Sequence, residues 1–422
     1  MISKERIDSL MFKDEALEFN DHTQTDLIGG MGKFGYSLLT ESQTSGKQPK
    51  NVLVSPFAVY SILLTLLAGA KGDTKKELEK ALAVNGSWKT FIGSGDYLHN
   101  VLERNKSSLT VDIANRIYIS TELQVPQLFT DSATFGFGSN VALVDFKKNN
   151  KVMAAINDFV NRVTHGRISK VVSEPLEKET SVAIISALFF QGAWRNVAQN
   201  VYQTIKFNAG CNSLEKAHSK WAKISGKIGY IKSSSVRAQL FRIPYDTGEN
   251  SLIDVDMVIA VPSTNHCDIR LWLGKVDWFT LMKAIGSMQT IEVDLLVPEF
   301  EMEWDTDLQK PLKGLGIVEA FDMDRADFSD MARPTMELPV SSGVYLSALF
   351  HHTKLILSTN GTEARLDNLS PRRKKRQAEA MDLKVTSSFY FAVVTSEPVA
   401  SSPKRTGELQ FMQLFTGTVV ML

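Results

Sequence analysis

The pattern of apolar positions begins with helices. Residues 56–70, PFAVYSILLTLLAGA, open with a proline, which is favoured in the first turn of a helix, and they are apolar on nearly every face. This pattern predicts a helix that the rest of the fold encloses. Gly72 ends it, and Thr74 together with Glu77 predicts a capping box at the start of a second, amphipathic helix.

Further along the chain, helical spacing gives way to strand patterns. Apolar residues recur at helical spacing over 151–165, and Gly166 stands where a left-handed cap belongs. Residues 182–190, VAIISALFF, are apolar at both alternating positions, as a strand at the centre of a sheet requires. Similar runs follow at Met257–Val261, Lys354–Leu357, Phe389–Val394 and Phe415–Val420. The order predicts an α+β fold, with two or more sheets packed with helices in one compact domain.

Composition agrees with a folded protein and excludes several function classes. Hydrophobic residues make up 43% of the 422 residues and charged residues 22%, so the chain can bury a large core. Lys and Arg number 47, as do Asp and Glu, and a chain of zero net charge is not a globally basic nucleic-acid binder. The only cysteines, Cys211 and Cys267, exclude a disulfide-built scaffold and a multi-cysteine zinc module. They form one bridge or, in the interpretation that we favour, two free buried thiols.

No segment of the sequence predicts membrane insertion. The longest apolar runs, residues 59–70 and 182–190, are shorter than the roughly 18–20 residues that cross a bilayer. The N-terminal residues mix charges throughout and lack the apolar stretch of a signal peptide. We therefore expect a soluble protein that has no membrane partner.

The sequence gives little sign of enzymatic chemistry. Gly30, Gly32 and Gly35 spell GxGxxG, but no strand precedes this motif and no long crossover helix follows it, so it does not predict dinucleotide binding. GxSxG, HExxH and P-loop motifs do not occur, and the seven histidines show no ligand spacing. We expect no catalytic site, no metal and no cofactor.

One polar segment, residues 361–385, interrupts the strand-rich C-terminal third. A polar stretch of about 24 residues between apolar strands is too long for a hairpin loop and is usually functional or disordered. It contains five consecutive basic residues: Arg372, Arg373, Lys374, Lys375 and Arg376. This basic run predicts a cleavage site for trypsin-like or furin-like proteases, a patch for nuclear import or for a heparin-like polyanion, or a solvated loop without function. The run by itself leaves these interpretations open.

Several motifs, in order along roughly residues 25–422, resemble those of the serpin family. They are Asn51–Thr74, Ile156–Val172, ISALFFQGAW at Ile185–Trp194, VPEF at Val297–Phe300, LGIVEAF at Leu315–Phe321, ADFS at Ala326–Ser329, HHTKLILSTNGTEA at His351–Ala364, and SSFYFAVV and LFTG near the C-terminus. The resemblance implies a serpin fold with three β-sheets, about nine helices and an exposed reactive-centre loop at about 361–385. The single serpin domain, residues 25–422, then follows an N-terminal extension of residues 1–24.

The resemblance also implies a mechanism of inhibition. A serine protease attacks the loop and forms an acyl-enzyme, and the cut loop then inserts as a new strand into the main sheet and carries the protease along, which distorts the protease active site. The native form is kinetically trapped above a more stable, loop-inserted state. Insertion adds a strand's backbone hydrogen bonds, each contributing roughly 0.5–1.5 kcal/mol net.

Inhibitory members of the family carry a flexible hinge, which here is matched by Gly361, Thr362, Glu363 and Ala364. Residues 365–368 replace the small residues that usually follow. With Thr362 facing the core, strand alternation turns the charged side chains to solvent and leaves Asn368 as the costly inward residue, at about 1–3 kcal/mol if its amide has no partner. Good helix formers within the loop would slow insertion. We predict an inhibitor, and the alternative is a non-inhibitory serpin (a carrier, chaperone or polyanion-binding protein) that proteases cleave as a substrate.

Counting along the loop places the scissile bond within the basic run. Counting forward from Gly361 by the family's usual hinge length gives Lys375, and counting back from a strand that begins near Val385 gives Gln377. The bond Arg376–Gln377 lies between these estimates and ends a furin-type Arg-Lys-Lys-Arg. We predict cleavage after Arg376, with Lys375 and Arg373 as alternatives.

Four more residues match family landmarks in the main sheet. Ser55 and His351 match the shutter, a hydrogen-bonded cluster beneath the sheet, and Trp194 matches the tryptophan of the breach. Ser186 stands where asparagine is usual and Ala58 where a second serine is common, so the resemblance implies a thinner network. Without the surrounding match, His351 would be interpreted as an ordinary core histidine.

These interpretations define the expected partners. We expect a monomer that binds a trypsin-like or furin-like serine protease, with a heparin-like polyanion as a second ligand of the basic run and no nucleic acid. The absence of a leader favours the cytosol, whereas the target class is mostly extracellular. We favour extracellular action.

Overall fold

The computed structural model describes residues 21–44, 48–84, 86, 90–91, 93–95, 97–98, 109–195, 197–208, 216–248, 254–263, 268–335, 343–357, 380–397 and 410–422. Cys211 and Cys267 lie outside these residues, so the prediction of two free thiols stays a prediction. Within the described residues, no helix is both long enough and apolar enough to cross a membrane.

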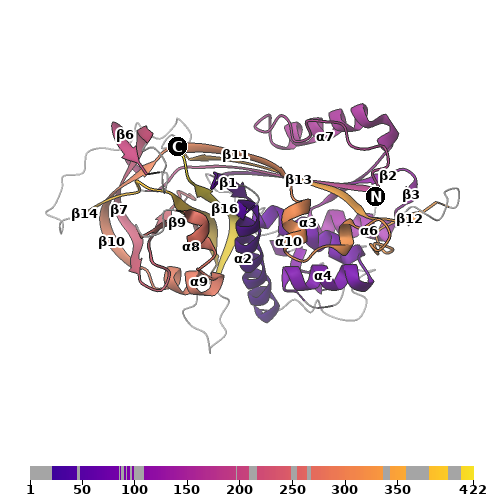
Figure 1. Cartoon of the computed structure of the whole chain (residues 1–422), viewed down its shortest axis with the longest axis horizontal. Helices are drawn as coiled ribbons and strands as arrows, with labels where there is room; N and C mark the ends of the chain where they lie inside the picture. The colour runs from indigo at the N-terminus through magenta and orange to yellow at the C-terminus, as the bar shows by residue number, and fades with distance from the viewer. Residues whose placement is uncertain are drawn as a thin grey trace.

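Three β-sheets form the framework of the molecule (Figure 1). The largest has the strand order β1 (Val52–Val54), β16 (Gln410–Val419), β15 (Phe389–Glu397), β9 (Asp254–Pro262), β8 (Ala238–Pro244), β7 (Lys216–Ser233), β10 (Gln289–Pro298) and β14 (Met381–Lys384), and β6 (Val197–Phe207) also pairs with β7. The five-stranded sheet has the order β11 (Phe300–Asp307), β13 (Leu346–Leu357), β5 (Val182–Gly192), β2 (Thr110–Ser120) and β4 (Asn140–Val144). Strands β3 (Leu123–Gln124) and β12 (Arg333–Pro334) form the third sheet. Each strand predicted from the sequence is found in this framework.

Helices cover the sheets. Among the described residues, the α-helices with assigned bounds are α2 (Asp21–Thr44), α3 (Pro56–Gly69), α4 (Gly72–Leu82), α6 (Gln127–Phe137), α7 (Asn149–Val163), α8 (Ile269–Leu273), α9 (Trp278–Gly286) and α10 (Gln309–Gly314). Short 3-10 helices, η1 (Phe146–Lys148) and η2 (Glu319–Phe321), complete these elements. The predicted α+β class is therefore confirmed.

Helix α3 is enclosed as the sequence predicted, because every one of its residues is buried. Its start follows from local chemistry. The Ser55 side chain accepts a hydrogen bond from the backbone N–H of Ala58, and Pro56 occupies the first turn, where its missing N–H costs no helical hydrogen bond.

The capping box predicted for helix α4 is wrong. The helix begins at Gly72, two residues before Thr74, and its N-cap residue makes no side-chain capping bond. Thr74 Oγ1 instead accepts a hydrogen bond from the backbone of Asp327, and Glu77 Oε2 accepts from the backbone N–H groups of residues 318 and 319. These side chains join α4 to a segment about 250 positions away, so tertiary contacts replaced the expected local ones.

The glycines of the GxGxxG pattern all lie inside helix α2 and form no phosphate-binding turn. A side chain at any of them would collide with a neighbour: Leu82 at Gly30, Trp278 at Gly32, and Pro56 at Gly35. The missing side chains of these glycines therefore allow α2 to pack closely against its neighbours.

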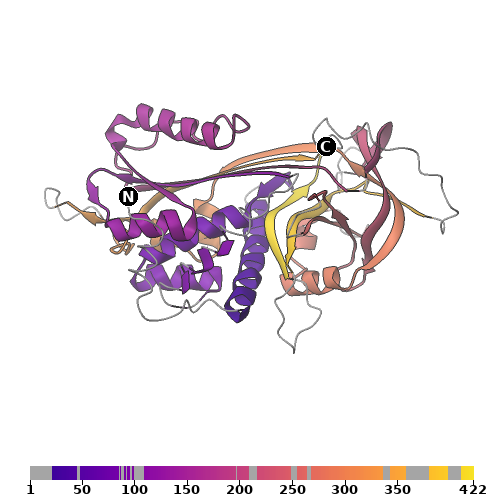
Figure 2. The ribbon, with the colours of Figure 1, turned by 180° about the vertical axis from the view of Figure 1, so that it is seen from behind.

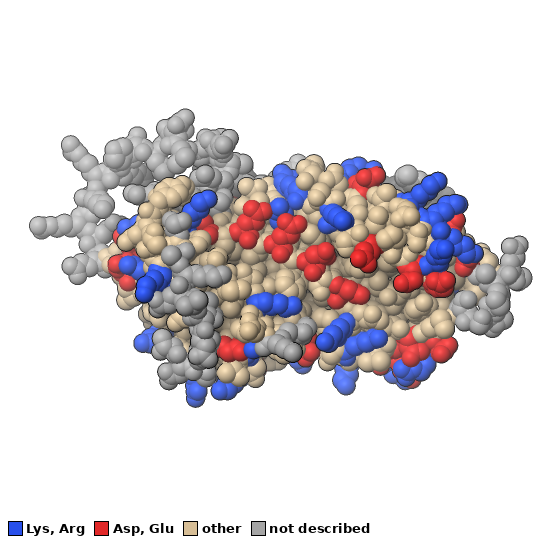
Figure 3. Space-filling view, turned by 45° about the horizontal axis from the view of Figure 1, so that its top comes forward, with Lys and Arg blue, Asp and Glu red and all other residues tan. Residues whose placement is uncertain are grey.

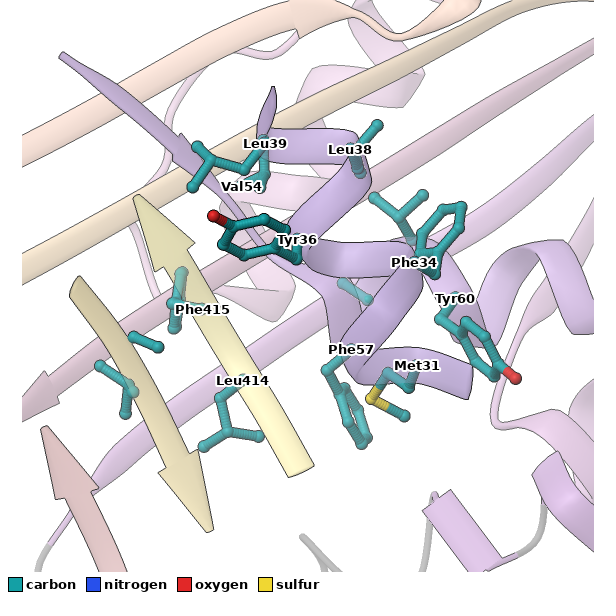
Figure 4. Packing of buried hydrophobic residues seen from close by; sticks show 14 of the residues in the cluster. Met31, Phe34, Tyr36, Leu38, Leu39, Val54, Phe57, Tyr60, Leu414 and Phe415 are labelled. Carbon is teal, nitrogen blue, oxygen red and sulfur yellow. The ribbon is translucent and has the colours of Figure 1, made fainter. Parts of the chain in front are cut away.

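Helix α2 passes through the middle of the molecule, as Figures 1 and 2 show from opposite sides. Figure 4 shows its apolar side chains, among them Met31 and Phe34, meeting those of α3 and β16. The Phe34 ring contacts the Tyr60 ring edge to face, with centroids 5.7 Å apart. This contact zone belongs to the main core, which includes residues of both larger sheets.

Helix α7 covers the opposite, outer face of the five-stranded sheet (Figure 1). Its buried residues Ile156, Phe159 and Val160 form a second core with strand residues such as Ala187 and Phe189. The predicted left-handed cap is confirmed, because Gly166 has φ 81° and its N–H donates to the Asn161 carbonyl at 2.7 Å.

Candidate functional site

The candidate site is the seam between strands β5 and β13 in the middle of the five-stranded sheet. These strands pair directly and in parallel, from Val182 opposite Leu346 to Gly192 opposite Leu357. Strand β13 also pairs with β11, and β5 with β2, so the seam has a paired strand on each side. Its two strands run in the same direction, so if they separated, each could pair with one antiparallel strand placed between them.

The segment that follows β13 connects two different sheets. The chain leaves the five-stranded sheet at Leu357. It enters the nine-stranded sheet at β14, which pairs in parallel with β10. Strand β14 thus occupies the last residues of the segment predicted as the reactive-centre loop. Residues 358–379 lie outside the described residues, and they include the predicted hinge (Gly361, Thr362, Glu363, Ala364), the basic run and the predicted bond Arg376–Gln377.

A buried hydrogen-bonded cluster lies directly beneath the seam. Three predicted residues meet there: Ser55 at the start of α3, Ser186 on β5 and His351 on β13, and none has exposed surface. The Ser55 backbone N–H donates to Nε2 of His351 at 3.0 Å, and Nδ1 of the same ring lies 3.0 Å from the Ser186 carbonyl oxygen. Since His351 and Ser186 are opposite each other in the β5–β13 register, the imidazole bridges the two strands at the seam.

The geometry fixes the protonation state of His351. Because Nε2 accepts a hydrogen bond, the ring proton must be on Nδ1, where it is donated to the Ser186 carbonyl oxygen. Complete burial disfavours the imidazolium and lowers the pKa of His351 from 6.5 to about 3. The ring is therefore neutral at physiological pH, and both of its nitrogens are hydrogen-bonded.

Sequence reasoning missed Asn115, which extends this cluster. Asn115 lies on β2 opposite Ser186, and its Nδ2 donates to the carbonyl oxygen of Ala58 at 3.0 Å. The sequence did contain a signal, because Asn115 stands at the same alternating strand positions as Ile117 and Ile119. All three side chains are buried on the inner face of β2. The cluster thus connects α3 to three adjacent strands even though Ser186 and Ala58 depart from the usual residues.

Trp194, the predicted breach residue, lies just beyond the end of the seam at which the chain leaves β13. It is 4% exposed and forms an isolated antiparallel bridge with Tyr245. Its ring is 6.3 Å from that of Tyr245, which in turn contacts Phe190 at 5.2 Å. These rings close the core at this end of the sheet.

Helix α7 restrains the seam from the outer side. The guanidinium carbon of Arg116, on β2, lies 3.6 Å from the centre of the Phe159 ring of α7, and Arg167 forms a 2.9 Å ion pair with Asp112 on the same strand. The second core under α7 also includes residues of both seam strands, such as Phe189 of β5 and Ala348 of β13. Separating β5 from β13 would therefore disturb this core as well as the cluster around His351.

Comparison with known proteins identifies the same family as the motifs. The family model described as "Serpin (serine protease inhibitor)" matches residues 30–400. Among curated proteins, Iripin-2 of Ixodes ricinus is 27% identical, covering 81% of this chain and 82% of its own length. Leukocyte elastase inhibitor of Sus scrofa is 25% identical (78% and 84% covered), and Antitrypsin of Bombyx mori is 27% identical (71% and 74% covered).

Solved structures share the fold at low sequence identity. Mouse protein-Z dependent protease inhibitor superposes with a TM-score of 0.78 at 18% identity, covering 96% of this chain and 100% of the other. Serpin48 of the insect Tenebrio molitor gives 0.74 at 22% identity, covering 94% and 98%. The three sheets and the helices described above therefore have the arrangement that the resemblance implied.

Proposed function

This chain belongs to the serpin family of serine protease inhibitors, which are not enzymes, and from this premise we propose that it traps trypsin-like or furin-like serine proteases by acyl-enzyme formation and loop insertion. Serine proteases are the partners that family membership implies. The basic specificity rests on the run Arg372–Arg376 in the loop, because the pockets of such proteases accept Arg and Lys by charge.

The observation that carries the proposal is the direct pairing of β5 with β13. An inserted strand would replace one parallel ladder, along residues 346–357, with two antiparallel ladders. It would add on the order of ten backbone hydrogen bonds, each of roughly 0.5–1.5 kcal/mol net. The native chain therefore has a sheet that can gain stability by accepting a strand, and the segment that follows β13 is long enough to supply it.

The experiment is incubation of the full chain with trypsin. The expected result is a covalent complex that survives SDS, together with a melting temperature of the loop-cleaved chain well above that of the intact chain. Cleavage without a complex and without a rise in melting temperature would contradict the proposal and would support the alternative, a non-inhibitory serpin cleaved as a substrate.

Matched variants assign the scissile bond. Arg376→Ala, Lys375→Ala and Arg373→Ala each remove one basic residue, and we expect Arg376→Ala to abolish the complex. The mass of the C-terminal fragment released from the denatured complex gives the bond directly, and a fragment beginning with Gln377 is the expected product. A fragment that begins with Arg376 or Lys374 would move the bond to one of the alternatives.

The same basic run is our candidate for binding a heparin-like polyanion, which would act where such proteases do, outside the cell. Retention on a heparin column should be lost when all five basic residues are replaced by Gln. Retention that survives this change would exclude the run as the polyanion site. Detection of the chain only inside cells that express it would contradict extracellular action.

A further inference from the structure

A cavity of about 570 Å³ lies at the far end of the β5–β13 seam, opposite the end from which the loop leaves. Its walls come from residues 171–177, 179 and 180, which follow α7, from the end of β11, and from the start of β13. The exposed Lys178 is not among the lining residues. The lining includes the apolar side chains of Val172, Leu176, Ala348 and Phe350. A cavity of this size with these apolar side chains in its lining can hold the stems of long side chains.

The rim of this cavity is acidic. Glu174, Glu177 and Glu179 line it from one side, and Asp305 and Asp307 from β11 line it from the other. No Lys or Arg is among the lining residues, and within the described chain the three glutamates form no ion pair. The imidazole of His352 approaches Asp305 at 3.9 Å, but burial lowers the pKa of His352, so it contributes little positive charge at neutral pH. Figure 3 shows Asp and Glu side chains running across one face of the molecule, with Lys and Arg side chains among and beside them.

The sequence of the loop determines what an inserted strand would bring to this cavity. In an inserted strand, a turn centred on residues 359 and 360 would place Thr362 opposite Leu357, and each later residue would then pair one position further back along β13. Ser370 thereby reaches Leu349 after eight residues, or about 26 Å of strand. Pro371 has no N–H to donate and disfavours continuation in the middle of a sheet. The next five residues, Arg372–Arg376, would leave the sheet beside Tyr345 and Ser347, which line the cavity.

We propose that this acidic cavity receives Arg372–Arg376 once the cut loop has inserted, an inference that rests on the proposed function. Five basic residues would meet five carboxylates, and their aliphatic stems would cover the apolar lining. The cavity then selectively stabilises the inserted form of a loop with a basic end, and a loop without those charges would lack this contact.

The uncut chain cannot make this contact. Only four residues lie between Arg376 and Met381, the first residue of β14, so the Cα atoms of Arg376 and Met381 are at most about 18 Å apart. Figures 1 and 2 show β14 at the opposite end of the molecule from β3 and β12. The cavity lies at the β3 end, because the backbone N–H of Ser120, just before β3, donates a hydrogen bond to the carbonyl oxygen of Ser181, just before β5. The run is therefore tethered far from the cavity until the bond after Arg376 is cut, so the contact distinguishes the inserted form from the native one.

The test uses the intact full chain and two synthetic peptides. One peptide has the sequence of residues 362–376, and the other replaces its five basic residues with Gln. Both should enter the seam as a strand and raise the melting temperature. We expect the native peptide to dissociate about tenfold more slowly than the Gln peptide at low salt, the effect of two or three surface ion pairs, and the difference to shrink at high salt.

Two triple variants locate the effect. Glu174→Gln with Glu177→Gln and Glu179→Gln removes three of the five rim charges and should reduce the difference between the peptides by more than half. Asp26→Asn with Glu292→Gln and Asp324→Asn removes the same charge elsewhere and should preserve it. Asp307 is left in place because its Oδ1 accepts the backbone N–H of Gln309.

Each outcome decides between the ideas. Equal dissociation of the two peptides from the wild-type chain would overturn the cavity proposal while leaving insertion intact. A difference that is undiminished in the rim variant would place the basic residues elsewhere and also overturn it. If neither peptide raises the melting temperature, the seam does not accept a strand, and the proposed function fails together with the inference that rests on it.

Discussion

Acidification should destabilise the native chain through His351, and the variant His351→Gln should reveal how much. In the native chain the ring is neutral because Nε2 accepts the Ser55 N–H and burial lowers its pKa to about 3. In the unfolded chain it has a pKa near 6.5. The unfolded state therefore binds the proton first as the pH falls, and stability is lost between about pH 6.5 and pH 3.

The magnitude follows from the two pKa values. At pH 5 the unfolded histidine is almost fully protonated and the native one is not, which costs the native state about 2 kcal/mol relative to pH 8. For a chain of this length the entropy of unfolding converts that free energy into a drop in melting temperature of about 2 °C. Glutamine can accept from Ser55 and donate to Ser186 but does not titrate, so the variant should lack this part of the drop.

The assay is differential scanning calorimetry of the intact wild-type and variant chains at pH 8 and pH 5. Other groups titrate in both chains and cancel in the comparison. Asp256 is one, because burial raises its pKa to about 6 and gives it the opposite pH dependence. If the two chains lose the same number of degrees on acidification, His351 is already protonated in the native state or is not buried, and the reasoning about the cluster is wrong.

Three further substitutions test contacts between elements of the fold. Phe159→Ala removes the α7 ring that lies beneath Arg116 and should lower the free energy of unfolding by about 3–5 kcal/mol in urea titrations; a loss below 1 kcal/mol would mean that α7 is not docked. Gly417→Ala points a methyl group at the Val52 carbonyl oxygen and should cost about 1–3 kcal/mol by the same measurement, whereas Gly286→Ala, where the space is open, should cost nothing. Glu77→Ala leaves two backbone N–H groups without their acceptor and should cost about 1–3 kcal/mol, and an effect no larger than that of the surface change Lys76→Ala would contradict this role.

The sequence was sufficient where burial alone decides structure. The run at 56–70 is apolar on every side and became α3, and the run at 182–190 is apolar on both strand faces and became β5, the strand in the middle of its sheet. Segments of this kind must lie in the interior, because any other placement would expose their apolar side chains to water. The capping box at Thr74 failed for the converse reason, since its two polar side chains found partners about 250 residues away that no local pattern reveals.

The candidate site could be predicted only in part. The motifs pointed to Ser55, Ser186 and His351, but their contact depends on the register of β5 with β13, which pairs residues about 165 positions apart. The role of Asn115 depends in addition on the register of β2 with β5. Registers of this kind are set by the whole sheet and cannot be obtained from spacing along one segment. The hinge and the basic run remain predictions, because they lie outside the described residues.

The position of β15 and β16 has a consequence for the molecule after it is nicked. Both strands lie in the interior of the nine-stranded sheet, between β1 and β9, and most of their described side chains are buried. A cut after Arg376 would put them on a separate polypeptide, residues 377–422, with no covalent link to the strands on either side. Its retention would depend on backbone pairing and apolar contacts alone. The nicked protein should therefore migrate as one species under native conditions and divide into two pieces only when denatured.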